Sequence, residues 1–158
     1  MGNLNKIQVS VIGAGTCSDD IASLAYEVGR HLALNDCVLL CGGLGGVMEH
    51  AAKGARESGG HTIGILPGFY ISDANPYIDI AVPTGISHAR NTIVVRSGMA
   101  CIAVKGSYGT LSEIAIALKL KKPVIGLNTW DISPDIIKAA NPEDAVKKAI
   151  EQINTGIN

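Results

Sequence analysis

The sequence predicts a single α/β domain: a Rossmann-like, doubly wound, mostly parallel sheet of about six or seven strands with helices on both faces. Apolar runs of strand length alternate with segments of helical period along the whole chain, as in successive βαβ units. Hydrophobic residues make up 47% of the chain and charged residues 17%, a balance that favours parallel strands buried on both faces. A length of 158 residues suits one core, so we expect one domain over residues 1–158.

Seven short apolar runs carry the strand signal, and each stops near glycine, proline or polar residues. In chain order they are 7–13 and 37–41, which both run into glycines, 61–66, which stops at Pro67, a short run at 78–82, then 100–104, 123–128 and an edge strand at 136–140. The segment 67–87 is the least regular part of the chain. We expect so long a loop to have a function, as a wall or lid of a site.

Apolar residues at helical spacing fill the intervals between these runs. In chain order the expected helices start after Ser18 or Asp19, with Ile21, Leu24, Ala25, Val28 and Leu32 on one face, then cover about 47–57, about 87–97, the stretch up to about Leu120, and Pro142 to about Ile153. Ser18, Asp19 and Asn141 are residue types that cap helix N-termini, and proline fits the first helical position.

The charge and hydropathy pattern narrows the expected partners. The net charge is −1 and the 13 Lys and Arg residues are scattered, so we expect no nucleic-acid partner. No apolar run approaches the ~18 residues of a membrane span and no secretory signal is recognised, so we expect a cytoplasmic protein without membrane contact. The thin polar surface suggests that a partner subunit covers some helix faces.

The four cysteines and four histidines show no metal-ligand spacing, so no metal is expected. Cys37, Cys41 and Cys101 lie in or beside apolar runs and are expected to be reduced, buried thiols. Cys17 lies in a loop without an evident base, which is typical of an inert thiol.

A strand, a glycine-rich turn and a helix follow one another three times, and these turns form the candidate site. In an open parallel sheet such turns lie together at the carboxyl edge, where ligands bind near the switch in strand order. The candidate residues are Gly13 and Gly15 in the first turn, Gly42, Gly43, Gly45 and Gly46 in the second, and Gly106, Ser107, Gly109 and Thr110 in the third.

Two familiar nucleotide motifs do not fit these turns. The dinucleotide fingerprint needs a third glycine where Ser18 stands and an acid after the second strand, which ends instead in Cys41 and Gly42. The triphosphate-binding loop needs a lysine after its glycines, and the segment 42–49 has none. What remains is glycine amides at the positive ends of helices, which attract a single phosphate group.

The third turn has two interpretations. Its glycines, with the hydroxyls of Ser107 and Thr110, are suited to surround one phosphate. Thr110 and Glu113 also match a T-x-x-E capping box, in which each side chain satisfies a backbone amide at the start of a helix. The box explains Thr110 and Glu113 but not the glycines before them.

Two segments, 42-GGLGGVME-49 and 105-KGSYGTLSE-113, resemble known motifs. They are similar to the G-G-G-x-x-G-L-M and P-G-G-x-G-T-x-x-E motifs of the LOG family, cytokinin-activating phosphoribohydrolases long mislabelled lysine decarboxylases. The same superfamily contains the molybdenum-cofactor carrier proteins. The resemblance spans roughly residues 7–128, and the spacing between Arg90 and Glu113 also matches. It therefore implies that Arg90 and Glu113 are the candidate catalytic pair. The resemblance also implies a homodimer or larger homo-oligomer.

Three positions depart from the LOG motifs: Asn91 stands in place of Lys, Lys105 in place of Pro and Ser107 in place of Gly. These features look more like the branch that lies near the cofactor carriers. Lysine decarboxylation is not expected, because it needs a pyridoxal-binding lysine and a cofactor pocket around it.

Two functions follow as hypotheses. The first is a carrier that binds a phosphate-bearing, nucleotide-like or pterin-like molecule, such as a nucleotide monophosphate or a molybdopterin-type ligand. The second is a LOG-type hydrolase that splits the N-glycosidic bond of a nucleoside 5′-monophosphate, with Glu113 stabilising positive charge or orienting water. Glu49, His88 and Tyr108 remain open between ligand contact and a structural role.

Overall fold

The computed structural model describes residues 6–156, which form one seven-stranded sheet and five α-helices. The strands are β1 (Gln8–Gly13), β2 (Val38–Cys41), β3 (Thr62–Leu66), β4 (Ile80–Pro83), β5 (Ala100–Val104), β6 (Val124–Leu127) and β7 (Ile136–Lys138). Their order is β4-β3-β2-β1-β5-β6-β7, and every neighbouring pair is parallel. The α/β, Rossmann-like class is confirmed, with a sheet that is parallel throughout these residues.

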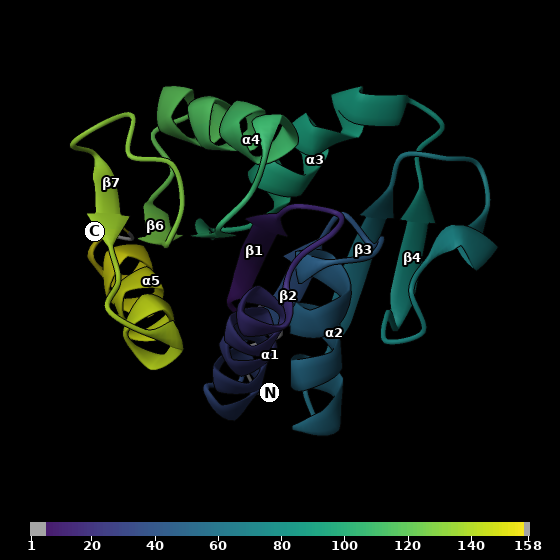
Figure 1. Ribbon diagram of the computed structural model, residues 1–158, viewed down its shortest axis with the longest axis horizontal. Coiled ribbons are helices and arrows are strands. Elements are labelled where there is room, and N and C mark those ends of the chain that lie inside the picture. Colours follow the sequence, from purple (N-terminus) through teal and green to yellow (C-terminus); the bar gives the residue numbers. More distant parts are fainter. Residues whose placement is uncertain (1–5, 157–158) are drawn as a thin grey trace.

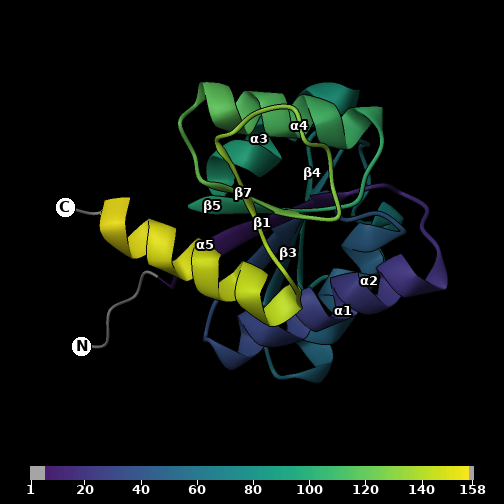
Figure 2. The same cartoon turned by 60° about the vertical axis from the view of Figure 1, so that its left-hand side comes forward.

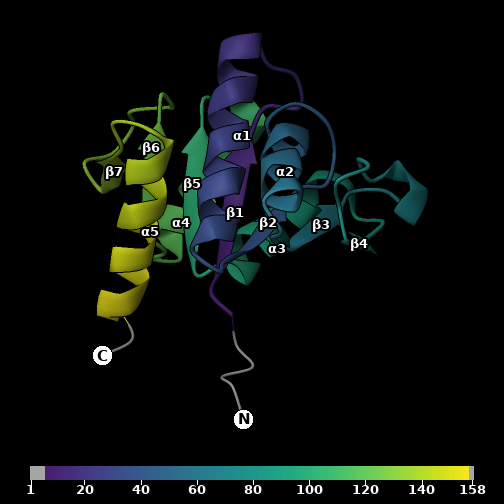
Figure 3. The same cartoon turned by 90° about the horizontal axis from the view of Figure 1, so that it is seen from below.

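Helices cover both faces of the sheet, as Figures 1 and 2 show. The helices are α1 (Asp19–Leu34), α2 (Val47–Glu57), α3 (Arg90–Ser97), α4 (Tyr108–Lys119) and α5 (Pro142–Gly156), and two short 3₁₀ turns are η1 (Ile71–Asp73) and η2 (Ser87–Ala89). Helices α1, α2 and α5 pack on one face, which is the face turned toward the viewer in Figure 3. Helices α3 and α4 pack on the other.

The alternation of side chains along each central strand builds both cores. In β1, Val9 and Val11 point into the core under α1, α2 and α5, whereas Ile12 points into the core under α3 and α4. In β5, Ile102 points into the core under α1, α2 and α5, and Cys101 points into the core under α3 and α4. Both faces of the middle strands are therefore buried, which explains why these strands read as unbroken apolar runs.

The chain order places a crevice beside β1. After β1 the chain adds β2, β3 and β4 toward one edge, then returns through α3 to place β5 on the other side of β1. This is the switch point of a doubly wound sheet, at which the connections leave in opposite directions. The three glycine-rich turns follow β1, β2 and β5, three strands that lie side by side.

Most predicted helices and strands are confirmed within a few residues. Of the predicted N-terminal caps, only one is confirmed in full. Asn141 caps α5 as expected, since its Oδ1 accepts a hydrogen bond of 2.9 Å from the amide of Asp144. Ser18 occupies the N-cap position of α1 but its side chain makes no capping bond. The capping box of Thr110 and Glu113 is wrong, because α4 already begins at Tyr108, with Ser107 in extended conformation at its N-cap.

The segment 67–87 is long but not structureless, since it holds η1 and β4 and ends at η2. The short run predicted at 78–82 is shifted, and the strand lies at Ile80–Pro83. Cys37, Cys41 and Cys101 are buried, as expected, and the loop residue Cys17 is half-buried. Within residues 6–156, no helix has the length and apolar character needed to span a membrane.

Candidate functional site

A cavity of about 150 Å³ lies at the carboxyl ends of β1, β2 and β5. Four of the predicted glycines line it, namely Gly13, Gly15, Gly42 and Gly109. Four predicted side chains also line it, namely Arg90, Ser107, Thr110 and Glu113. The fold therefore brings together residues from all three glycine-rich turns and from α3, which are far apart in the sequence.

The other predicted glycines lie outside this cavity and have structural roles. A Cβ atom at Gly46 would meet the backbone of Ala14 and Gly15, so Gly46 allows the first two turns to pack together. Gly46 also has a φ of 61°, in the left-handed region that favours glycine. A Cβ atom at Gly45 would approach the backbone carbonyl oxygen of Gly15, and one at Gly43 would meet the side chain of Leu66.

Gly106 lies on the far side of its turn, where it lines a second cavity. Its φ is 108°, and a Cβ there would collide with the side chain of Thr110. Gly106 thus allows the chain to turn sharply from β5 into α4.

Arg90 is the cation of the site and begins α3. Its side chain is 9% exposed: Nη1 donates to Oδ1 of Asn91, and Nη2 donates to the carbonyl oxygen of Gly42 over 3.4 Å. Burial lowers the pKa of Arg90, and the nearby Glu113 opposes that shift. An arginine nevertheless keeps its charge in proteins, so the cavity holds a fixed positive charge.

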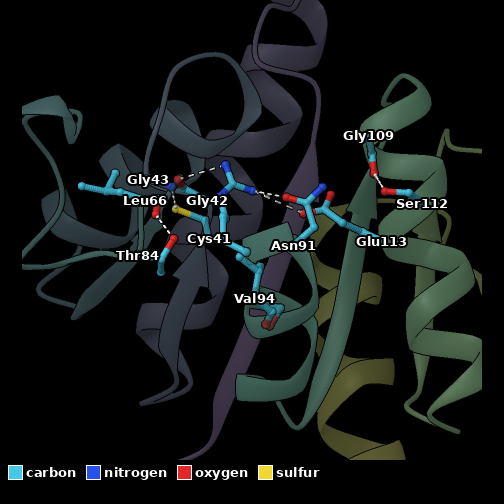
Figure 4. A network of polar contacts seen from close by, with 12 residues as sticks. Cys41, Gly42, Gly43, Leu66, Thr84, Asn91, Val94, Gly109, Ser112 and Glu113 are labelled. Carbon is cyan, nitrogen blue, oxygen red and sulfur yellow. Dashed lines mark hydrogen bonds and ion pairs between the residues drawn. The ribbon is translucent and has the colours of Figure 1, made fainter. Parts of the chain in front are cut away.

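Glu113 faces Arg90 from the second turn of α4. Its side chain is 8% exposed, and Oε1 lies 3.9 Å from Nη1 of Arg90. Burial raises the pKa of Glu113 to about 7, while the charge of Arg90 acts in the opposite direction. Figure 4 shows Glu113 of α4 beside Asn91 of α3, opposite the turn of Gly42 and Gly43 that follows β2.

Two buried polar atoms at the cavity lack partners. Nε of Arg90 and Oγ1 of Thr110 make no hydrogen bond to any residue between 6 and 156. Buried polar groups are nearly always paired, and each exception needs an explanation such as a functional role. Both atoms belong to residues that line the cavity, so a ligand there is suited to pair them.

The first turn of α4 adds amide donors to the same place. The first backbone bond inside this helix runs from the amide of Leu111 to the carbonyl of Ser107, which leaves the amides before Leu111 without that helical bond. Gly109 lies in this turn, and a Cβ there or at Gly15 would meet no atom within 4 Å. Open glycines beside the positive end of a helix dipole provide a cradle for an anion.

Sequence reasoning missed some of the lining. In the sequence Asn91 stood out only because it departs from the LOG motif, yet its side-chain oxygen accepts a hydrogen bond from the guanidinium of Arg90. His88, left open between two roles, lines the cavity, as does Met48 at the start of α2. Glu49 does not line it. A hydrophobic residue such as Met48 carries no sequence signal that separates a cavity wall from a core.

A parallel sheet with a glycine-lined, arginine-bearing cavity at its switch point is typical of Rossmann-like proteins that bind small molecules. The chain belongs to the SLOG cluster4 family, whose family model matches residues 6–155. The resemblance to the LOG and cofactor-carrier superfamily is therefore confirmed.

Two curated relatives illustrate the range of this group. A protein of Archaeoglobus fulgidus is 45% identical over 93% of this chain and 97% of its own length. A probable cytokinin riboside 5′-monophosphate phosphoribohydrolase of Oryza sativa subsp. japonica is 31% identical, over 57% of this chain and 41% of the rice protein.

Two solved structures match nearly the whole chain. The molybdenum cofactor binding protein from Rippkaea orientalis has a TM-score of 0.88 and 38% identity, and the match covers 99% of this chain and 100% of that one. The molybdenum cofactor carrier protein from Chlamydomonas reinhardtii has a TM-score of 0.85 and 32% identity, over 95% of this chain and 99% of that one.

Proposed function

We propose that this protein binds a phosphate-bearing, nucleotide-like or pterin-like small molecule in the cavity and carries it without cleaving it. The observation that carries the proposal is the pair of unpartnered buried atoms, Nε of Arg90 and Oγ1 of Thr110, beside the open first turn of α4. A phosphate group supplies acceptor oxygens for both donors and for the helix amides, and its charge complements Arg90.

The similarity to cofactor-binding structures supports a carrier. Both matches extend over at least 95% of this chain, whereas the match to the rice enzyme covers 57%. The site also differs from the LOG motifs at Asn91, whose amide occupies one end of the guanidinium of Arg90. A pterin-type or nucleotide-type ligand therefore fits the proposal, with its phosphate in the cavity.

We extend the proposal to assembly and location: a homodimer or larger homo-oligomer, acting in the cytoplasm. Large apolar side chains are exposed around η1 and β4, including Phe69 at 75% and Ile80 at 58%. Such a cluster is typical of a surface that a partner covers. Light scattering at micromolar concentration tests assembly, and a monomeric mass would contradict it.

A LOG-type phosphoribohydrolase is the second candidate function, because Arg90 and Glu113 do face each other across the cavity. In this mechanism a carboxylate stabilises the oxocarbenium-like transition state or orients water, while the arginine holds the phosphate or assists departure of the base. Burial raises the pKa of Glu113 to about 7, which suits proton transfer to or from water at neutral pH but leaves less of the ionised carboxylate that charge stabilisation needs.

The first experiment measures binding. Inorganic phosphate, ribose 5-phosphate and a panel of nucleoside 5′-monophosphates are added to the protein, and thermal unfolding is followed. A ligand at a hundred times its Kd stabilises the folded state by about 2.7 kcal/mol, so the melting temperature rises. We expect the rise to vanish in Arg90→Met and to persist in Arg96→Met, which removes an exposed arginine of the same helix. An equal rise in both variants contradicts the proposal.

The second experiment measures cleavage. The same monophosphates are incubated with the protein and free base is assayed. We expect no release of base. Release that disappears in Glu113→Gln would overturn the carrier and establish the hydrolase.

A further inference from the structure

A second cavity, of about 310 Å³, lies beside the first, at the carboxyl ends of β5 and β6. It is lined by Lys105, Gly106, Asn128, Thr129 and Trp130. The short turn between β5 and α4 separates the two cavities, because Gly106 lines the second and Ser107 the first. A ligand that passes over this turn therefore contacts both.

Two strained residues fix the shape of this cavity. Lys105 directly follows β5 with a φ of 50°, and Asn128 directly follows β6 with a φ of 53°. Left-handed backbone is uncommon for residues other than glycine and persists where surrounding contacts hold it, often at functional sites. Here the hydroxyl of Thr129 donates to the carbonyl of Lys105, which ties the two strand ends together.

An aromatic pair lies beside the turn between the two cavities: Trp130 lines the second cavity, and Tyr108, which directly follows Ser107, stacks against Trp130. The ring centroids of Tyr108 and Trp130 lie 6.1 Å apart, with an angle of 29° between the rings. Nε1 of Trp130 donates to the carbonyl of Ser107 over 3.2 Å, so the turn that lines the first cavity positions this tryptophan. Tyr108 is 81% exposed even though it is stacked, which leaves ring surface open to a ligand.

Polar groups accompany the aromatic surface. The ammonium of Lys105 makes no hydrogen bond or ion pair in the part of the chain from 6 to 156, and the amide of Asn128 is exposed. An ammonium donor and an amide are suited to the oxygen and nitrogen atoms at the edge of a heterocycle. Aromatic rings are suited to its face.

The size of the first cavity requires such an extension. Pockets that enclose a whole drug-sized ligand measure roughly 300–1,000 Å³. The first cavity measures about 150 Å³, enough for a phosphate and its immediate neighbours but not for a nucleotide or a pterin phosphate. The remainder of the ligand therefore lies outside it, and the adjacent cavity offers the aromatic surface.

We propose that Tyr108, Trp130 and Lys105 form the subsite that binds the planar heterocycle of the ligand, while its phosphate occupies the first cavity. This assignment rests on the proposed function for its phosphate half. It explains Lys105 and Trp130, which the phosphate site alone does not use.

The test uses Trp130, because it is the only tryptophan of the chain and its emission reports on this cavity. The full-length protein is titrated with ribose 5-phosphate, with the common nucleoside 5′-monophosphates and neopterin monophosphate, and with the unphosphorylated nucleosides and neopterin. We expect at least one ring-bearing phosphate to change Trp130 emission and to bind more tightly than ribose 5-phosphate.

The variant Tyr108→Ala separates the two halves of the ligand. Stacking on one aromatic residue accounts for about fivefold to a hundredfold in affinity. We expect Tyr108→Ala to weaken that ring-bearing ligand by about fivefold or more and to leave ribose 5-phosphate within twofold. Tyr70→Ala is the matched control, since Tyr70 is 68% exposed and precedes η1, whereas Tyr108 stacks on Trp130. We expect it to leave both affinities unchanged.

The outcomes distinguish the subsite from the proposed function. If ribose 5-phosphate binds and no ring improves affinity, or if Tyr108→Ala weakens both ligands equally, the subsite is overturned and the phosphate site stands. If no phosphate binds but an unphosphorylated ring changes Trp130 emission in a Tyr108-dependent way, the subsite stands and the phosphate proposal fails. If nothing binds, both are overturned. Changed light scattering in Tyr108→Ala without changed affinity would assign Tyr108 to a subunit interface and overturn the subsite.

Discussion

Nη1 of Arg90 lies 3.9 Å from Oε1 of Glu113, and both side chains are less than one-tenth exposed. This separation is too long for a hydrogen bond, and Asn91 takes the nearer position on Nη1. The attraction between the two charges is therefore weakened by poor geometry, while both groups have lost their hydration. The pair therefore costs stability in the protein without ligand, which is typical of residues kept for binding or catalysis.

Glu113 makes the unfolding free energy depend on pH. Burial raises the pKa of its carboxyl from 4.5 to about 7, so the folded state holds a proton that the unfolded state has lost. This contribution is fully present below about pH 4.5 and is lost as the pH rises through about 7. Relative to Glu113→Gln, we expect the wild type to lose roughly 3 kcal/mol between about pH 5 and about pH 8. Urea unfolding of both proteins across this range measures the difference, and parallel curves would contradict it.

Removal of Arg90 alone is expected to destabilise the protein through the carboxylate that it leaves behind. Arg90→Met deprives buried Glu113 of its cation, at a cost of about 3 kcal/mol when Glu113 is ionised. The loss should be larger at about pH 8 than at about pH 5, where the carboxyl is protonated. Glu113→Gln in the same chain removes the unpaired charge, so the double variant should recover part of the loss. A strictly additive double variant would show that the two residues are not coupled.

Thr110 provides a direct sign of a site that is kept at the expense of stability. Its buried Oγ1 has no partner within residues 6–156, so Thr110→Val removes an unpaired hydroxyl and should raise the free energy of unfolding by about 1 kcal/mol. The same change at Thr62 is the control, because its buried hydroxyl donates to the backbone carbonyl oxygen of Tyr77 over 2.6 Å. Thr62→Val should lower stability by about 1–3 kcal/mol.

The binding readout completes this test. Phosphate should bind more weakly to Thr110→Val than to the wild type, while Thr62→Val should bind it normally. Calorimetric titration measures both affinities. If Thr110→Val destabilises the protein as much as Thr62→Val, its hydroxyl has a structural partner in solution and does not await a ligand.

The sequence was sufficient for the sheet, because its strands owe their form to burial on both faces. A run such as 100–104 can bury its apolar side chains on both faces only between two layers of helices, and all five residues are buried in the structure. The helix predicted at about 47–57 is likewise confirmed, and it runs from Val47 to Glu57 directly after the second glycine turn. Patterns within each short segment were therefore sufficient to predict this strand and this helix.

The site was only partly predictable, because it depends on contacts between distant segments. The T-x-x-E pattern at Thr110 fits a capping box locally, but the packing of Glu113 against Arg90 draws this glutamate into the cavity. Gly42 and Gly43 look alike in the sequence, yet only Gly42 faces Arg90. Which glycine touches a ligand and which supports a turn follows from tertiary packing, which single residues do not encode.

Two glycines inside helices lead to a prediction with a reversed sign. Glycine in a helix normally costs about 1 kcal/mol relative to alanine, so its replacement should stabilise. At Gly29 in α1, however, a Cβ would collide with the backbone carbonyl of Ala51 in α2, and Gly54 meets the backbone of Tyr26 in the same way. We expect Gly29→Ala to lower the unfolding free energy by about 1–3 kcal/mol, because two packed helix backbones must separate.

Gly156 is the matched control for this effect. It lies at the end of α5, where a Cβ would meet no atom within 4 Å, so Gly156→Ala should leave stability unchanged or raise it by less than about 1 kcal/mol. Urea unfolding of both variants measures the two signs. Opposite signs establish that the close approach of α1 and α2, and not helix propensity, requires glycine at position 29. A stabilised Gly29→Ala would show that the two helices can move apart at no cost.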